Sequence, residues 1–282
     1  MDQSSKTEAG QLQIRKLTPD DLGFAQELRS IAGWNQTDQD WLRYMAYEPD
    51  GCYAAEWDGV PVGTVTTTSY ETDLAWIGMM LVHPDYRRRG IASVLMRTAI
   101  DYLQGKGIPC IKLDATPLGE PVYAKLGFQP EWKLNRWEFV FPEVEASYDT
   151  LVGGSLETYA DLDRNAFGTD RTNWLTRLEA GARHVVYAPD GYGMIRTGVR
   201  ANYLGPIVSS SPETARDMVR QLIRYASGRT FWDIPADNQV AVQLAEELKF
   251  EKTRDLLRMW LGDWNVAGST TLQYGFGDPS TG

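Results

Sequence analysis

Hydrophobic and polar residues follow two rhythms over the first half of the chain. Residues 12–17 alternate as a strand does, whereas 18–34 and 37–45 repeat apolar side chains at helical spacing. Strand-like stretches follow at 52–59, 61–70, 74–82, 110–115 and 136–141. Two further helical patterns lie between them, at 93–107 and 121–127. The resulting order, β-α-α-β-β-β-α-β-α-β, predicts an α/β (α+β) domain whose fully apolar segment 74–82 lies at the centre of a sheet.

Two of the expected helices carry start signals. Thr18 precedes Pro19 and two acidic residues, which is the usual composition of a first helical turn. Thr37 and Asp40 have the spacing of a capping box. These signals fix the beginnings of both helices that follow the first strand.

The second half of the chain repeats the first half in a weaker form. After a linker-like stretch at 142–155 and helical patterns at 155–167 and 171–181, residues 185–193, 203–208, 211–228 and 231–262 echo the later elements of the first half. We therefore predict a tandem duplication with domains at 11–142 and 150–264. Residues 265–282 form a Gly/Ser/Thr-rich tail that we expect to be partly disordered near its end.

Composition narrows the classes of function. The chain has 282 residues, 38 acidic against 28 basic, and a net charge of −10. This balance argues against nucleic acid as a partner. It suits a cationic small molecule, although acidity that serves only solubility explains it equally well.

Other classes lack their usual signatures. The polar N-terminal stretch has no signal-peptide core and no apolar run reaches membrane-spanning length, so we expect a cytoplasmic protein without a membrane partner. Cys52 and Cys110 are expected to be reduced core residues. His83 and His184 have no ligand-spaced neighbours, so no metal site is expected. Nucleophile-elbow, Walker and dinucleotide-binding glycine motifs are also missing.

A basic turn connects the central strand to the long helix at 93–107. Arg87, Arg88 and Arg89 are followed by Gly90 and Ala92. A helix start offers unpaired backbone N–H groups, glycine permits a close approach, and arginine adds charged contacts to phosphate oxygens. Its position after a central strand makes the turn a candidate pyrophosphate site rather than a solvated charge run.

The sequence around this turn resembles the GCN5-related N-acetyltransferase (GNAT) superfamily. "MMLVHPDYRRRGIASVLM" is similar to the family's Arg/Gln-x-x-Gly-x-Gly/Ala motif, and "PVYAKLGF" is similar to its later Tyr-x-x-x-Gly-Phe element. The resemblance covers about residues 11–142. It implies a mixed, mostly antiparallel central sheet flanked by helices, and an acyl-CoA donor, usually acetyl-CoA.

The resemblance also implies a set of donor-binding residues. Backbone groups of Met80 and Val82 would pair with the pantetheine arm, and the amides from Arg88 to Ser93 would hold the pyrophosphate. Thr116 stands where many family members have an asparagine. The donor-binding residues expected in this way are Met80, Leu81, Val82, Arg87, Arg88, Arg89, Gly90, Ile91, Ala92, Ser93, Thr116 and Tyr123.

Direct transfer of the acyl group needs an acid and a base. Tyr123 matches the family's general-acid position, with a core tyrosine as the structural alternative. Asp114, at a strand end, and Glu71 or Asp73, before the central strand, are candidate bases. A helix cap for Asp114 and a solvated turn for the other two remain open, and His83 fits a surface residue better than a base.

The acceptor is expected to lie against the connection between the first two helices. Trp34, Asn35, Asp38 and Trp41, with Asp114, could form an aromatic and acidic pocket for a cationic amine. The alternative, compatible with the first, is that the polar residues cap a helix while the tryptophans pack.

The second half lacks the donor-binding signals. Its "GPIVSSSPETA" has neither arginine nor glycine at the matching offset, and Ala245 replaces Tyr123, although Asn238 stands at the family's asparagine position. This layout resembles a GNAT subgroup with a degenerate C-terminal GNAT-like domain. Such a domain could wall the acceptor pocket through Trp174, Tyr203, Trp232 or Asp233, or could be purely structural.

We therefore expect an acetyl-CoA-dependent N-acetyltransferase that acts on a primary amine of a small cationic molecule. An aminoglycoside-type antibiotic, a polyamine and an amino-acid derivative all fit the expected pocket. A non-catalytic acyl-CoA sensor and a protein amine acetyltransferase are the alternatives. The sequence leaves the oligomeric state open, a homodimer included.

Overall fold

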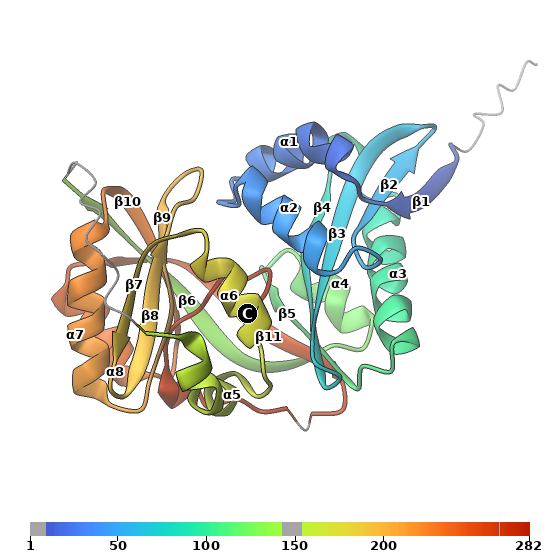
Figure 1. Ribbon diagram of the computed structural model, residues 1–282. Helices are drawn as coiled ribbons and strands as arrows, with labels where there is room; N and C mark the ends of the chain where they lie inside the picture. The colour runs from blue at the N-terminus through green and yellow to red at the C-terminus, as the bar shows by residue number, and fades with distance from the viewer. Residues whose placement is uncertain (1–9, 143–153, 265) are drawn as a thin grey trace, which may run out of the picture.

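A computed structural model describes residues 10–142, 154–264 and 266–282. It consists of two α/β halves that lie side by side, with two long strands running between them (Figure 1). Most of the linker predicted at 142–155, and the predicted domain start at 150, lie outside the described residues. No helix in the described ranges is both long and apolar enough to cross a membrane.

The first half has the order of elements that the hydrophobic pattern predicts. Its strands and helices are β1 (Leu12–Lys16), α1 (Leu22–Ala32), α2 (Asp38–Tyr47), β2 (Tyr53–Trp57), β3 (Val60–Tyr70), β4 (Leu74–Val82), α3 (Ile91–Gly105), β5 (Cys110–Ala115), α4 (Glu120–Lys125) and β6 (Gln129–Phe141). Short 3-10 turns precede α1 (Pro19–Asp21) and α3 (Pro84–Tyr86).

The capping signals act where they were predicted. The Thr37 side chain accepts a hydrogen bond from the Asp40 amide at 3.3 Å, and Asp40 accepts one from the Thr37 amide at 2.7 Å. At the 3-10 turn that leads into α1, the Thr18 amide and hydroxyl both donate to the Asp21 carboxylate, at 2.8 and 3.1 Å. Gly33, with φ of 68°, ends α1 in the left-handed conformation that a non-glycine residue adopts only with strain.

The second half repeats this order. Its elements are a 3-10 turn (Leu156–Tyr159), α5 (Ala160–Phe167), α6 (Thr172–Glu179), β7 (Ala182–Ala188), β8 (Gly191–Arg196), β9 (Asn202–Ser209), α7 (Pro212–Leu222), a 3-10 turn (Ile223–Tyr225), β10 (Gly228–Pro235), α8 (Gln239–Glu247), β11 (Glu251–Gly262), a 3-10 turn (Thr270–Leu272) and β12 (Gln273–Gly275). The predicted fold class is confirmed: the sheet is mixed and mostly antiparallel, and helices flank it.

The two halves exchange their closing strands. The described strands form one 12-stranded sheet in the order β1-β2-β3-β4-β5-β11-β6-β10-β9-β8-β7, with β12 paired to β9. Thus β11 from the second half pairs with β5, whereas β6 from the first half pairs with β10 (Figure 1). The sequence pattern did not predict this exchange, which makes one continuous sheet from two repeats.

The C-terminal segment is buried between the halves, so the expectation of partial disorder near its end is wrong. The Trp76 indole donates to the carbonyl of Pro279 at 3.1 Å, and the Tyr70 hydroxyl donates to that of Thr281 at 2.6 Å. Arg171 donates to the carbonyl of Gly282 at 3.0 Å. The chain ends near the centre of the molecule, as Figure 1 shows.

Candidate active site

The turn between β4 and α3 has an open helix start. Gly90 is the N-cap of α3 and has φ of 82°, a conformation that favours glycine. A Cβ atom added at Gly90 would meet nothing within 4 Å, so the space above the turn is free of protein. The first amides of this 15-residue helix have no partner in the preceding turn, and the helix dipole favours an anion there.

The three arginines of this turn have different surroundings. Arg87 donates from Nε to the carbonyl of Val82 at 3.0 Å, which ties the turn to the end of β4. The guanidinium of Arg89 lies over the rings of Trp57 and Tyr86, at 5.2 and 5.1 Å from their centroids. Arg88 is exposed and has no hydrogen bond or ion pair among the described residues. Its charge is therefore the most available to an anion.

Strand β4 separates from β5 at the end that leads to this turn. The two strands pair only at residues 74–76 of β4, whereas β4 pairs with β3 along its whole length. The edge of residues 77–82 that faces β5 therefore has no strand partner among the described residues. Met79, with φ of 46°, forms a bulge here, and its carbonyl accepts a hydrogen bond from Thr64 at 2.8 Å. Unpaired backbone groups at such an edge can bind an extended ligand.

Tyr123 lies on the short helix α4 beside this separation. Its side chain is buried, its ring packs 6.1 Å from that of Phe128, and burial raises its pKa to about 12. The phenol oxygen has no hydrogen-bond partner in the part of the chain that the structure describes. The group is therefore protonated at neutral pH and free to donate. Thr116, which precedes α4, accepts a hydrogen bond from the Gly119 amide at 3.2 Å.

Asp114 is tied to an arginine rather than free. Its two oxygens accept hydrogen bonds from Arg258 at 2.8 and 2.9 Å, and its side chain is fully buried. Burial raises the pKa of Asp114, and the guanidinium of Arg258 opposes this effect. Arg258 in turn lies over the rings of Trp76 and Trp132, at 4.4 and 4.1 Å. Protonating Asp114 would leave a buried cation without its counterion, which makes Asp114 a poor base.

A pocket lies where the two halves meet the separated strands. The first half contributes the connection between α1 and α2, the bulge of β4, the end of β5, and Tyr123. The second half and the exchanged strands contribute the rest. The lining residues are Trp34, Asn35, Gln36, Ile77, Gly78, Met79, Met80, Leu113, Asp114, Thr116, Tyr123, Arg136, Tyr203, Arg254, Leu256, Asp278, Pro279 and Ser280.

Of the five residues predicted to bind the acceptor, three line this pocket, Asp114 among them, and two do not. Trp34 and Asn35 are in its wall. The amide of Asn35 holds the loop between β8 and β9, because it accepts from the Ala201 amide and donates to the Ala201 carbonyl, both at 3.0 Å. The prediction for Trp41 is wrong, because its ring is fully buried in the core. That for Asp38 is also wrong, because it is exposed on α2 away from the pocket wall.

The predicted base Glu71 is also wrong. Glu71 is exposed in the turn before β4, and the first residues of β4 pair with Cys110 at the start of β5. The pocket lies at the other end of both strands, by Met79 and Asp114. Five residues of strand between Leu74 and Met79 span about 17 Å, which puts Glu71 out of reach of the pocket. Asp73, in the same turn, is excluded for the same reason.

The C-terminal segment supplies a pocket residue that the sequence did not predict. Asp278 is buried, and its oxygens accept hydrogen bonds from the Gln36 side chain, both at 3.1 Å. The amide of Ser280 also donates to it, at 2.7 Å, as does the Ser280 hydroxyl. Burial raises the pKa of Asp278. The available signal was the Tyr-Gly-Phe-Gly-Asp run at 274–278, because exposed tails seldom carry two large aromatic residues so close together.

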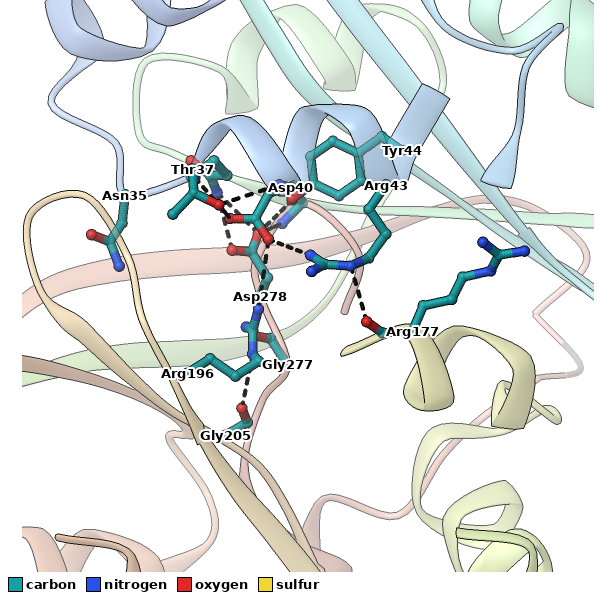
Figure 2. A network of polar contacts seen from close by, with 12 residues as sticks. Asn35, Thr37, Asp40, Arg43, Tyr44, Arg177, Arg196, Gly205, Gly277 and Asp278 are labelled. Carbon is teal, nitrogen blue, oxygen red and sulfur yellow. Dashed lines mark hydrogen bonds and ion pairs between the residues drawn. The ribbon is translucent and has the colours of Figure 1, made fainter. Parts of the chain in front are cut away.

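Arg196 holds this segment in place. Figure 2 shows its guanidinium between the two halves, donating to the carbonyls of Gly205 and Gly277. It also lies 3.9 Å from Asp40, at the start of α2. The segment that carries Asp278 is thus fixed between α2 of the first half and the strands of the second half.

In the second half, the chain itself fills the groove that corresponds to the separated strands. Strands β9 and β10 pair only at Asn202 and Tyr203, and beyond that point β12 pairs with β9. The amide of Asn238 donates to the carbonyl of Gln273 in β12 at 2.9 Å. The residue at the family's asparagine position therefore binds the protein's own strand. Among the described residues, β12 thus covers the edge of β9 that corresponds to the unpaired edge of β4.

The sequence matches two family models. Residues 20–128 match the Acetyltransferase (GNAT) family, and residues 159–275 match an Acetyltransferase (GNAT) domain. An uncharacterized N-acetyltransferase of Bacillus subtilis, YitH, is 27% identical over 191 residues, 64% of this chain and 67% of the relative. One from Methanocaldococcus jannaschii is 28% identical over 44% of this chain and 63% of its own length. The chain thus spans about two thirds of these relatives.

Solved structures agree with the tandem arrangement. A candidate acetyltransferase from Pyrococcus horikoshii superposes with a TM-score of 0.84 at 26% identity, over 96% of each chain. A tandem GNAT protein from the clavulanic acid biosynthesis pathway has the same fold, with a TM-score of 0.61 at 16% identity over 95% of this chain and 100% of its own. This chain belongs to the GNAT acetyltransferases: it is an acyltransferase with one GNAT domain in each half.

Proposed function

We propose that the chain transfers the acetyl group of acetyl-CoA directly to a primary amine of a small molecule, and that only the first half binds the donor. One observation carries the proposal: a single pocket joins the unpaired edge of β4, the protonated Tyr123 and a buried carboxylate, Asp278. Acetyl-CoA supplies the activated thioester carbonyl.

The proposed donor site is the one with open space and free amides. The start of α3 at Gly90 would receive the pyrophosphate, and Arg88 would add charge to it. The unpaired edge of β4 from Met80 to Val82 would hold the pantetheine arm. The corresponding edge of β9 is paired with β12, which supports one donor site per chain.

The proposed transfer balances in atoms and protons. The amine nitrogen forms a bond to the thioester carbonyl carbon while the bond from that carbon to sulfur breaks. Backbone N–H groups at the Met79–Met80 bulge stabilise the oxyanion. The phenol of Tyr123 gives a proton to the leaving sulfur and regains one from the nitrogen through the pocket. An ammonium acceptor loses a further proton before attack, and Asp278, whose hydrogen-bond partners are neutral, accepts it.

Release of CoA thiol measures this reaction. Purified protein with acetyl-CoA and a panel of primary amines is expected to release thiol above the hydrolysis rate, with a matching acetylated product by mass spectrometry. Gly90→Val would abolish the release, because its side chain would enter the open space above the helix start. Background release with every amine, despite tight CoA binding, would support an acyl-CoA sensor instead.

Access favours small acceptors over protein amines. The pocket is walled by the C-terminal segment from Asp278 to Ser280, and this segment is tied down by Arg196 and Trp76. A protein chain would have to displace it to bring a lysine or an N-terminus to the bulge of β4. Acetylation of peptide amines at rates equal to those of small amines would contradict this choice of acceptor.

A further inference from the structure

Four charged side chains line the pocket, and two of them are neutralised inside the protein. Asp114 pairs with Arg258 through two hydrogen bonds. Arg136 pairs with Asp233 in the same way, at 2.8 and 2.7 Å. The remaining two, Arg254 and Asp278, have no ion pair among the residues that the structure describes. The pocket therefore presents one cation and one carboxylate that no direct ion pair neutralises, although Asp233 acts on Arg254, and Arg196 on Asp278, from a longer distance.

Arg254 is an arginine without a partner. It lies on the exchanged strand β11, where its Cα pairs with that of Arg136 on β6. It is half-buried, and no described residue offers its guanidinium a hydrogen bond or a carboxylate within 4 Å. Asp233 is already hydrogen-bonded to Arg136, and Asp233 and Glu138 act on Arg254 without a hydrogen bond or an ion pair to it. A half-buried guanidinium next to a second one is costly unless a ligand supplies an anion.

Asp278 presents the opposite charge with neutral partners. Gln36 and Ser280 donate to it, but no cation lies within 4 Å. The Oε1 atom of Gln36 is buried and has no donor in the described part of the chain. A carboxylate beside an unsatisfied amide oxygen suits a group with several N–H donors, which an ammonium provides.

We propose that the acceptor carries both a primary amine and a carboxylate, with the ammonium at Asp278 and Gln36 and the carboxylate at Arg254. The class is that of amino acids and their derivatives. This rests on the proposed acetyl transfer and selects among its acceptors. Polyamines and aminoglycoside-type molecules carry only positive charge, and their extra ammonium groups would meet Arg254 unfavourably.

The test compares acceptors that differ only in the carboxylate. A panel of α-, β- and ω-amino acids is assayed beside the corresponding amides and decarboxylated amines, with acetyl-CoA held saturating. We expect kcat/KM for the best amino acid to exceed that of its amide by about tenfold to a hundredfold, the usual worth of a hydrogen-bonded charge. Equal kcat/KM values for acid and amide across the panel would overturn the inference.

Arg254→Met isolates the carboxylate site. Because Arg254 makes no hydrogen bond or ion pair with the described residues, its replacement should leave the melting temperature unchanged or slightly higher. The variant should lose the preference for amino acids while it acetylates decarboxylated amines within about threefold of the wild-type rate. Arg254→Lys should keep part of the preference, since the charge remains. A preference that survives in Arg254→Met would overturn the assignment. Arg220→Met, on the exposed face of α7, is the matched control.

Binding without the donor gives a second readout. Calorimetry of the preferred amino acid should show a Kd weakened in Arg254→Met by about the same factor as kcat/KM, and unchanged in Arg220→Met. Unchanged affinity in Arg254→Met would overturn the inference. If amines turn over regardless of a carboxylate, this inference alone fails. If CoA binds but no amine in the panel releases thiol, the acetyl-transfer proposal fails and this inference falls with it.

Discussion

Replacing Tyr123 with phenylalanine tests the proposed acid with little structural disturbance. The phenol oxygen makes no hydrogen bond to the described residues, so its removal leaves no buried group unpaired, and the ring can keep its contact with Phe128. We expect the free energy of unfolding to change by less than about 0.5 kcal/mol. The affinity for CoA should also stay within about twofold, because the proposed donor contacts are the backbone groups of β4 and α3 and the Arg88 side chain, none of which the substitution changes.

Catalysis should suffer far more than stability. A general acid typically contributes about a hundredfold to ten-thousandfold, so Tyr123→Phe is expected to lower kcat by a factor in that range. The assay is CoA thiol release at saturating acetyl-CoA and acceptor, with Kd for CoA measured by calorimetry on the same preparations. Tyr123→Trp would be a poor choice, because its larger ring would disturb the packing of α4.

The pH dependence gives an independent check. Burial raises the pKa of Tyr123 to about 12, so the acid form predominates at all pH values below that. Deprotonation of Tyr123 should therefore lower the activity only near pH 12. Tyr123→Phe should lower the whole pH profile without changing its shape below about pH 10. The assignment is refuted if the variant retains kcat within threefold. It is also refuted if the wild type has an alkaline limb near pH 8 that the variant lacks.

Three further predictions concern the supports of the site. Arg258→Met should cost about 3–5 kcal/mol in urea denaturation, because it leaves the Asp114 carboxylate buried without its partner, and adding Asp114→Asn should recover part of the loss. A cost below 1 kcal/mol would contradict the ion pair. Burial raises the pKa of Glu48, but hydrogen bonds, including one from Lys106 at 2.7 Å, hold that pKa below its ordinary value. The stability that Glu48 contributes is therefore present at neutral pH and is lost as the pH falls through the lowered pKa. Glu48→Gln should flatten the acid side of the curve of melting temperature against pH; an unchanged curve would speak against it. Asn238→Ala should cost about 2–3 kcal/mol of stability, because it removes the cap of α8 and two hydrogen bonds to the chain before and in β12. The Kd for CoA should stay unchanged. A weakened Kd would place donor binding partly in the second half.

The order of elements followed from local patterns, but the exchange of strands did not. The alternation of residues 136–141 and 251–262 is the same whichever half of the sheet accepts them, because a strand's pattern records its buried face and not its neighbour. The weak repeat therefore predicted a tandem duplication with a central sheet in each domain. Only the three-dimensional structure shows that β6 and β11 change places.

The site was partly predictable for a similar reason. The basic turn, the unpaired strand and Tyr123 belong to contiguous motifs, so the family resemblance located them. Arg254 and Asp278 reach the pocket from β11 and from the C-terminal segment, far from those motifs in sequence. Glu71 and Trp41 were wrong because proximity in sequence to the motif does not determine which end of a strand, or which face of a helix, meets the pocket.

The buried C-terminal segment shows how composition misled. Gly, Ser and Thr dominate residues 265–282, and this favours disorder on average. Here Phe276 stacks on Trp132 with ring centroids 5.4 Å apart, and glycine at 275 allows close contact with the Leu204 carbonyl of β9 and with Trp232. Burial of a few aromatic side chains orders this segment despite its polar composition.

Titration calorimetry of CoA against the whole chain tests the central claim most directly. The open start of α3 and the β9 edge already paired with β12 predict one CoA per chain. Gly90→Val should weaken that binding at least tenfold, because φ of 82° strains any other residue and the new side chain enters the ligand's space. Two CoA molecules per chain, or a Kd that Gly90→Val leaves unchanged, would contradict the account.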